Sequence, residues 1–411
     1  MQITAFNTAS SISGDKSRLH YLDIARALSI ILVVLNHYDL VLPFSPALKA
    51  LSYFEWFRMP TFFIISGLLY NFPKKTKTSE FLKNKAINLL VPYFAWGMLL
   101  ESIDTIIYVS TESATSYSEN IFLFAGKLLA YKLSVLAYGG HLLKPPVMTT
   151  WYILTLLLTI GLFTAIKLAV KKDFMVVLVA AVCGWLGILL SRANTDLPWN
   201  FNVALVALVY FTMGYYSKDF IRRINQVPRL MLYLVPPSVF VAATLIKLHQ
   251  TGVIHFKITM FTGDFSSYAL CLIIPPVFSF LVLCLSIVLS NSAFSKPLCF
   301  IGRNTLPILY LHWAIGTSAI AILKQYNIET SPLGWSALGI SIPLLLASYL
   351  NKNALLAAMF LGKNSSRIFI KEHSDACTTI TREHTQVLIP TKKVISRIPV
   401  ENELSLENQT Y

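Results

Sequence analysis

An arginine and a histidine lie eleven positions apart in an apolar stretch near the start of the chain. Ten residues without an ionisable side chain separate Arg26 from His37. In a helix, eleven steps of about 1.5 Å place the two groups roughly 16 Å apart and, after nearly three turns, on almost the same side. A neutral imidazole suits a general base near neutral pH, and a guanidinium offers a planar pair of donors for phosphate. The spacing therefore predicts a base and an anion-binding group on one helix face.

Each of the two residues also has a structural interpretation. His37 could be a buried histidine bonded to a neighbouring helix, and Arg26 an interfacial arginine paired with Asp23, one turn earlier. His37 lies, however, in the polar cluster Asn36-His37-Tyr38-Asp39. Ionisable groups inside membrane helices are costly and usually face an interior cavity, which favours a functional site. We expect Asp23, Asn36 and Tyr38 to contribute substrate contacts there.

The composition predicts which elements hold this site. The 411 residues are 55% hydrophobic and 13% charged, whereas soluble domains carry about 25% charge. The apolar runs are continuous over about 17 to 24 residues, which favours helices over a barrel. We therefore predict an all-α, polytopic transmembrane helix bundle surrounded by membrane lipid. Basic residues in alternate loops explain the net charge of +14, so we expect no nucleic-acid partner.

About ten membrane spans are expected. They cover about 20–42, 53–72, 86–109, 149–169, 174–191, 201–217, 230–248, 267–290, 304–323 and 333–350. Segment 121–138 is interpreted as an interfacial or re-entrant helix, with an eleventh span as the alternative. The alternation of basic loops places both termini in the cytoplasm. The tandem Pro275-Pro276 predicts a break or kink in the eighth span.

The domain boundaries follow from the same pattern. The transmembrane domain is predicted over 20–362, after a polar segment of residues 1–19 and before a polar cytoplasmic tail, 363–411, which we expect to be disordered. The five cysteines have no metal-ligand spacing, and four of them lie in apolar runs, so no metal site is expected.

Five motifs follow one another along residues 19–350. They are Leu22-Asp23 with Arg26 and His37, Phe57-Arg58-Met59-Pro60 with Ser66-Gly67, Leu90-Val91-Pro92-Tyr93, Trp151-Tyr152-Ile153-Leu154, and Phe300-Ile301-Gly302-Arg303-Asn304-Thr305-Leu306 with Tyr310-Leu311-His312. Together they resemble the membrane acyltransferase-3 family, in particular its branch of fucose 4-O-acetylase-like and polysaccharide O-acetyltransferases.

The resemblance implies an O-acyltransferase of the bacterial inner membrane. Its expected donor is cytoplasmic acetyl-CoA, and its expected acceptor is a hydroxyl of an envelope polysaccharide or of its lipid-linked precursor. Arg26 would meet the CoA phosphates, with Arg303 and Lys85 as further basic candidates, and His37 would lie near the thioester. Trp151 and His312 are candidates for contacts with the acceptor sugar.

Arg58 departs from the family pattern, because a histidine is expected at this position. An arginine cannot act as a base at ordinary pH, but it can bind an anionic sugar or a developing oxyanion. It could also be a simple arginine at the outer membrane surface. An alternative function is a transporter or flippase of saccharide or lipid intermediates, which intramembrane Arg and His residues and an interrupted helix also suit. We find no inverted repeat between the two halves of the sequence.

Overall fold

The computed structural model describes residues 19–41, 53–112, 121–193, 195, 197–326, 331–363 and 365. The predicted polar segment 1–19 and tail 363–411 lie almost wholly outside these residues. The helices are α1 (His20–Val41), α2 (Arg58–Leu69), α3 (Thr78–Glu112), α4 (Ile121–Tyr138), α5 (Trp151–Ala169), α6 (Asp173–Arg192), α7 (Phe201–Tyr216), α8 (Lys218–Gln226), α9 (Met231–Gln250), α10 (Tyr268–Ser290), α11 (Ser295–Arg303), α12 (Thr305–Gln325), α13 (Pro332–Leu350) and α14 (Ala354–Leu361). Two-residue strands, β1 (Ile258–Thr259) and β2 (Asp264–Phe265), pair antiparallel between α9 and α10.

Seven of the described helices are long and apolar enough to cross a membrane: α1, α3, α4, α5, α6, α10 and α13. Many of their large apolar side chains are exposed to the surroundings, as lipid contact requires. The prediction of a helical membrane bundle is therefore confirmed. The number of spans and the side of the termini stay predictions.

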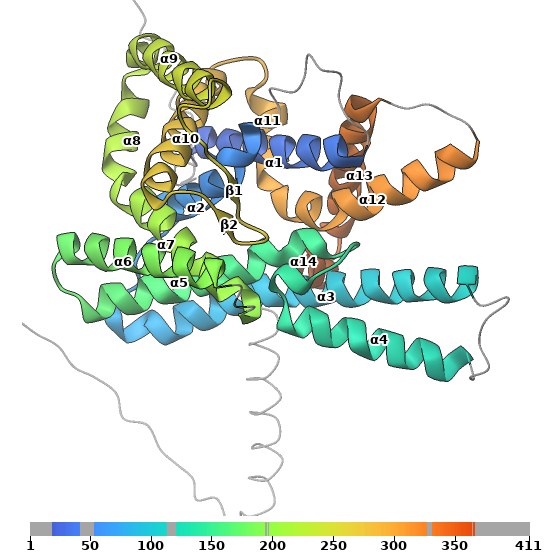
Figure 1. The fold of residues 1–411 in the computed structure, drawn as a ribbon. Coiled ribbons are helices and arrows are strands. Elements are labelled where there is room, and N and C mark those ends of the chain that lie inside the picture. Colours follow the sequence, from blue (N-terminus) through green and yellow to red (C-terminus); the bar gives the residue numbers. More distant parts are fainter. Residues whose placement is uncertain are drawn as a thin grey trace, which may run out of the picture. The chain divides into compact units, whose positions relative to one another are not determined.

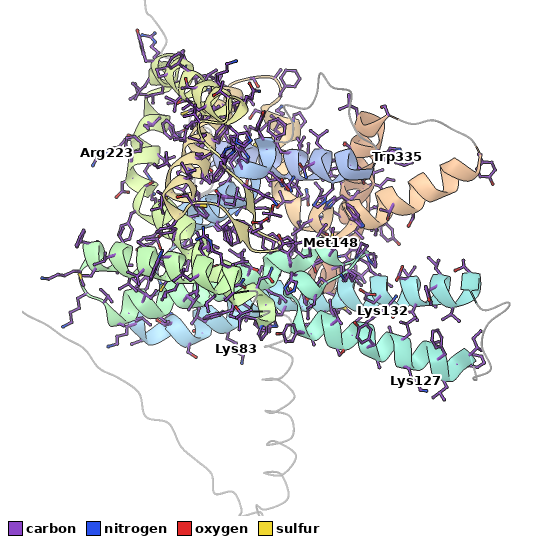
Figure 2. The ribbon with its side chains drawn as sticks, in the orientation of Figure 1. Lys83, Lys127, Lys132, Met148, Arg223 and Trp335 are labelled. Carbon is purple, nitrogen blue, oxygen red and sulfur yellow. The ribbon has the colours of Figure 1, made fainter. Side chains whose placement is uncertain are left out.

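Helix α4, predicted to be interfacial or re-entrant, is one of the seven described helices that are long and apolar enough to cross a membrane, and Leu136 is its buried residue. It lies antiparallel beside α3, which has 35 residues (Figure 1). Lys132, labelled in Figure 2, joins the two helices: its Nζ atom lies 2.5 Å from Asp104 Oδ2 and 3.6 Å from Glu101 Oε2. This ion-pair cluster links the two helices and favours one register between them.

Helix α10 runs through Pro275 and Pro276 as one element. The helix is therefore not broken there, and a kink at the two prolines stays a prediction. Pro275 has no N–H, so the carbonyl of Cys271 loses its helical partner. The hydroxyl of Tyr210 on α7 donates to that carbonyl at 2.9 Å. A buried side chain from another helix thus satisfies the group that the proline frees.

Helix α1 occupies the centre of the fold and packs against α2, α10, α11, α12 and α13 (Figure 1). Helix α2 in turn packs against α7 at very short range, because a Cβ atom on Gly67 would lie 2.0 Å from the carbonyl oxygen of Phe211. The glycine therefore serves close helix packing. These contacts fix the two helices, α1 and α2, that carry most of the predicted site residues.

Candidate active site

The central helix presents four residues of one face to two adjacent cavities. Arg26 and Ile30 line a cavity of about 200 Å³, called here the Arg26 cavity. Val33 and His37 line a second one of about 190 Å³, the His37 cavity. The spacing of these four residues keeps them on one side of α1, so the arginine and the histidine share a facing direction. Met59 of α2 lines both cavities.

The Arg26 cavity contains two arginines held by one carboxylate. Asp23 is buried, with Oδ1 3.8 Å from Arg26 Nη1 and Oδ2 3.1 Å from Arg303 Nε. Arg303 ends α11, which lies so close to α1 that a Cβ atom on Gly302 would be 1.8 Å from the carbonyl oxygen of Asp23. Both guanidiniums line the cavity and stay partly exposed, so this end can receive an anion.

Lys85 is placed near this group but does not line the Arg26 cavity. It lies on α3 with its Nζ atom 5.7 Å from the centre of the Phe81 ring. Its expected contact with the donor phosphates is therefore less direct than that of the two arginines.

Buried polar atoms without a hydrogen-bond partner in the described part of the chain gather in and beside the His37 cavity. His37 Nδ1 and Arg58 Nη1 belong to residues that line it, whereas His312 Nε2 and Trp313 Nε1 belong to neighbouring residues that do not. The centre of the His37 ring lies 5.2 Å from the ring of His312 and 5.2 Å from that of Trp313. Buried polar atoms are nearly always paired, so this concentration indicates a place where a ligand or water completes the hydrogen bonds.

The backbone fixes the protonation form of His312. Its Nδ1 atom lies 2.8 Å from the carbonyl oxygen of Ile308, which only accepts, so Nδ1 carries a proton, and in the neutral ring the lone pair is on Nε2. Tyr38 donates to the carbonyl oxygen of His312 at 2.5 Å and is itself fully buried. Tyr38 thus holds His312 in place and lines neither cavity.

Arg58 reaches the His37 cavity from the first turn of α2. Pro60 is accommodated there because the first N–H groups of a helix have no helical acceptor. Arg58 Nη2 lies 3.7 Å from Glu55 Oε1, and both residues line the cavity. Arg58 is 8% exposed, so it is not a surface arginine.

The other predicted contacts divide between the two cavities and the core. Trp151 lines the His37 cavity, and its ring centre lies 6.1 Å from that of Phe261, which follows β1 and lines the same cavity. Asn36 is buried but lines neither cavity. Glu55, Met59, Thr149 and Trp313 were not predicted. Glu55 alone had a signal in the sequence, a carboxylate one helical turn before an arginine.

Fold and site together define a multi-pass membrane protein with two adjacent internal cavities, one lined by two arginines and the other by a histidine. The chain belongs to the acyltransferase-3 family, whose acyltransferase domain matches residues 19–352. It is therefore a membrane acyltransferase, and the resemblance seen in the motifs is confirmed at the level of the family. No curated protein and no solved structure gives a significant match to the chain.

Proposed function

We propose that this acyltransferase is an O-acetyltransferase of the bacterial inner membrane. It takes acetyl from cytoplasmic acetyl-CoA and transfers it to a hydroxyl of an envelope polysaccharide or of its lipid-linked precursor. The observation that supports this proposal most is the placement of Arg26 and His37 on one face of α1, in two cavities with a common wall.

The donor enters with its phosphates at the Arg26 cavity. Arg26 and Arg303 offer two guanidiniums to the phosphates, and the carboxylate of Asp23 contacts both of them. The pantetheine arm then runs along Ile30 and Val33, which are apolar, toward His37. Arg26 and His37 are roughly 16 Å apart along α1, a distance that an extended arm of this kind spans.

The imidazole of His37 removes the proton of the acceptor hydroxyl as its oxygen attacks the thioester carbonyl carbon. The negative charge that develops on the carbonyl oxygen is stabilised by the buried guanidinium of Arg58, whose Nη1 atom is unpaired in the described residues. The intermediate then collapses, the C–S bond breaks, and the protonated His37 returns its proton to the sulfur. The products are an acetyl ester and CoA. His312, in ring contact with His37, acts as its positioning residue.

The transport alternative loses one of its supports in the structure. It drew on an interrupted eighth span, whereas α10 is continuous and its freed carbonyl at Cys271 is satisfied. The intramembrane arginines and histidines remain compatible with transport, and an activity measurement separates the two functions.

The test compares two histidine variants. His37→Ala is expected to insert and fold normally but to lose acyl transfer, because the base is missing. His255→Ala is the matched control, since His255 is an exposed loop residue between α9 and α10. Mass spectrometry of the envelope polysaccharide from cells with each variant reads the result. Loss of one acyl increment in the first variant alone supports the proposal, and its retention there excludes His37 as the base.

A further inference from the structure

We propose that the side chain of Met59 is a movable partition between the Arg26 cavity and the His37 cavity, which the acyl end of the donor displaces to reach the base. This inference rests on the proposed function for the identity of the passing group. The existence of the partition can be tested without it.

The two cavities meet at a single side chain. Of the residues that line them, Met59 belongs to both, whereas every other one belongs to one cavity. On α1 the boundary between the two cavities falls between Ile30 and Val33. On α5 it falls between the neighbours Trp151 and Tyr152. Met59 therefore lies at the level where one cavity ends and the other begins.

The residues around Met59 are held in place by ring contacts and hydrogen bonds, which a methionine side chain does not make. Tyr152 packs against the rings of Phe62 and Phe63, with centres 5.7 and 5.1 Å away, and its hydroxyl lies 3.4 Å from Ser66 Oγ. Thr149, on the His37 side, donates to the carbonyl oxygen of Leu309, on the Arg26 side, at 2.8 Å. Opening a passage through these residues would break ring contacts and buried hydrogen bonds.

Met59 can move at much lower cost. Its backbone is held in the first turn of α2, where the N–H of Thr61 donates to the carbonyl of Phe57 at 2.8 Å. Its side chain is unbranched, has three rotatable bonds, and makes no strong hydrogen bond. A change of rotamer therefore opens the passage without moving the helix. Met59 is 9% exposed, so in this structure it fills the space between the two cavities.

Such a partition has a chemical purpose in this site. The thioester must reach His37 from the Arg26 cavity, while water from the acceptor side must be kept from hydrolysing it. An apolar side chain that yields to the arm and closes behind it meets both requirements. Met59 is thus a positioning residue for the donor and controls its access to the base.

The test measures the sidedness of two introduced thiols in sealed vesicles. Ser66→Cys reports on the Arg26 cavity and Thr259→Cys on the His37 cavity, both in a variant whose native cysteines are replaced by serine or alanine. A charged, membrane-impermeant thiosulfonate reagent is added to one side at a time. With Met59 present, each thiol is expected to react from one side only, and the two sides are opposite.

Met59→Ala is expected to abolish this sidedness, so that each thiol reacts from both sides. Met59→Leu, which restores the volume, is expected to keep it. Met213→Ala is the matched control, because Met213 lines a different cavity next to α7. Unchanged sidedness in Met59→Ala, or reaction from both sides with Met59 present, overturns the partition.

A second measurement connects the partition to the donor. Purified Met59→Ala is expected to hydrolyse bound acetyl-CoA faster than the parent protein, with acetyl-CoA binding measured separately in both. If the parent protein binds no acetyl-CoA, the proposed function fails, and the labelling experiment still decides whether Met59 divides the cavities. If binding occurs and hydrolysis does not rise, Met59 does not control access of water to the thioester.

Discussion

Two buried tyrosines each donate a hydrogen bond to a helix carbonyl. Loss of one should mainly reduce stability, and loss of the other should mainly reduce acyl transfer. Tyr38 donates to the carbonyl of His312 at 2.5 Å, and Tyr210 to the carbonyl of Cys271 at 2.9 Å. Both tyrosines are fully buried, and neither lines a site cavity. Replacing either one with phenylalanine removes one oxygen atom and leaves the packing of the ring unchanged.

The stability cost should be larger at Tyr210. The carbonyl of His312 lies inside α12 and keeps its helical partner four residues later, so Tyr38→Phe should cost about 0.5–1.5 kcal/mol. The carbonyl of Cys271 has no helical partner because residue 275 is proline, so Tyr210→Phe leaves a buried acceptor unsatisfied and should cost about 1–3 kcal/mol.

The activity should change in the opposite order. Tyr38 fixes His312, whose ring contacts His37, so its loss lets the base shift, and misplacement by about 1 Å can reduce a rate up to roughly a hundredfold. We expect Tyr38→Phe to lower acyl transfer about tenfold or more and Tyr210→Phe to leave it near the parent rate. Thermal unfolding in detergent and acetyl transfer at saturating acetyl-CoA measure the two effects. Equal activity of the two variants would show that His312 does not position His37.

Two further predictions concern the Arg26 cavity. Arg26→Lys should weaken acetyl-CoA binding, measured by titration calorimetry, because the planar pair of donors is lost while the charge remains; unchanged affinity would exclude Arg26 as a phosphate ligand. Asp23→Asn should strengthen acetyl-CoA binding at low salt, because removal of the carboxylate raises the positive potential of the cavity. The same change should lower the free energy of unfolding by only about 1–2 kcal/mol, because both arginines that lose their ion pair are partly exposed. Weaker binding in Asp23→Asn would mean that the carboxylate orients Arg26 and Arg303 more than it reduces their attraction for the anion.

The positions of the long helices could be predicted from the sequence because membrane spans are set by the length of apolar runs. The predicted stretch 267–290 corresponds to α10, and 174–191 to α6, within two residues. Helix α2 is much shorter than the predicted 53–72 because residues 53–56 form a 3₁₀ turn and Tyr70 is already extended. Helices α8 and α11 were interpreted as loops, because charged residues within nine-residue amphipathic helices resemble those of a basic loop.

The facing of Arg26 and His37 was also predictable, since it follows from the helical repeat alone. Other parts of the site depend on contacts between distant segments. Tyr38 was expected to bind substrate, because a polar residue beside His37 carries no sign that its hydroxyl reaches α12 instead. Met59 has no reactive group, and its importance comes only from lying between two cavities. The donor that satisfies α10 is on α7, so no local pattern around Pro275 indicates it.

The ten-residue interval between Arg26 and His37 serves two purposes at once. It sets the distance between the group that receives an anion and the group that removes a proton. It also supplies Ile30 and Val33, the apolar residues at the level where Met59 closes the passage from the opposite helix. An ionisable residue in this interval would attract water to the boundary between the two cavities, which the thioester must cross. Burying its charge among apolar residues would also cost desolvation free energy. The absence of ionisable groups in the interval is therefore as much a part of the site as Arg26 and His37 at its two ends.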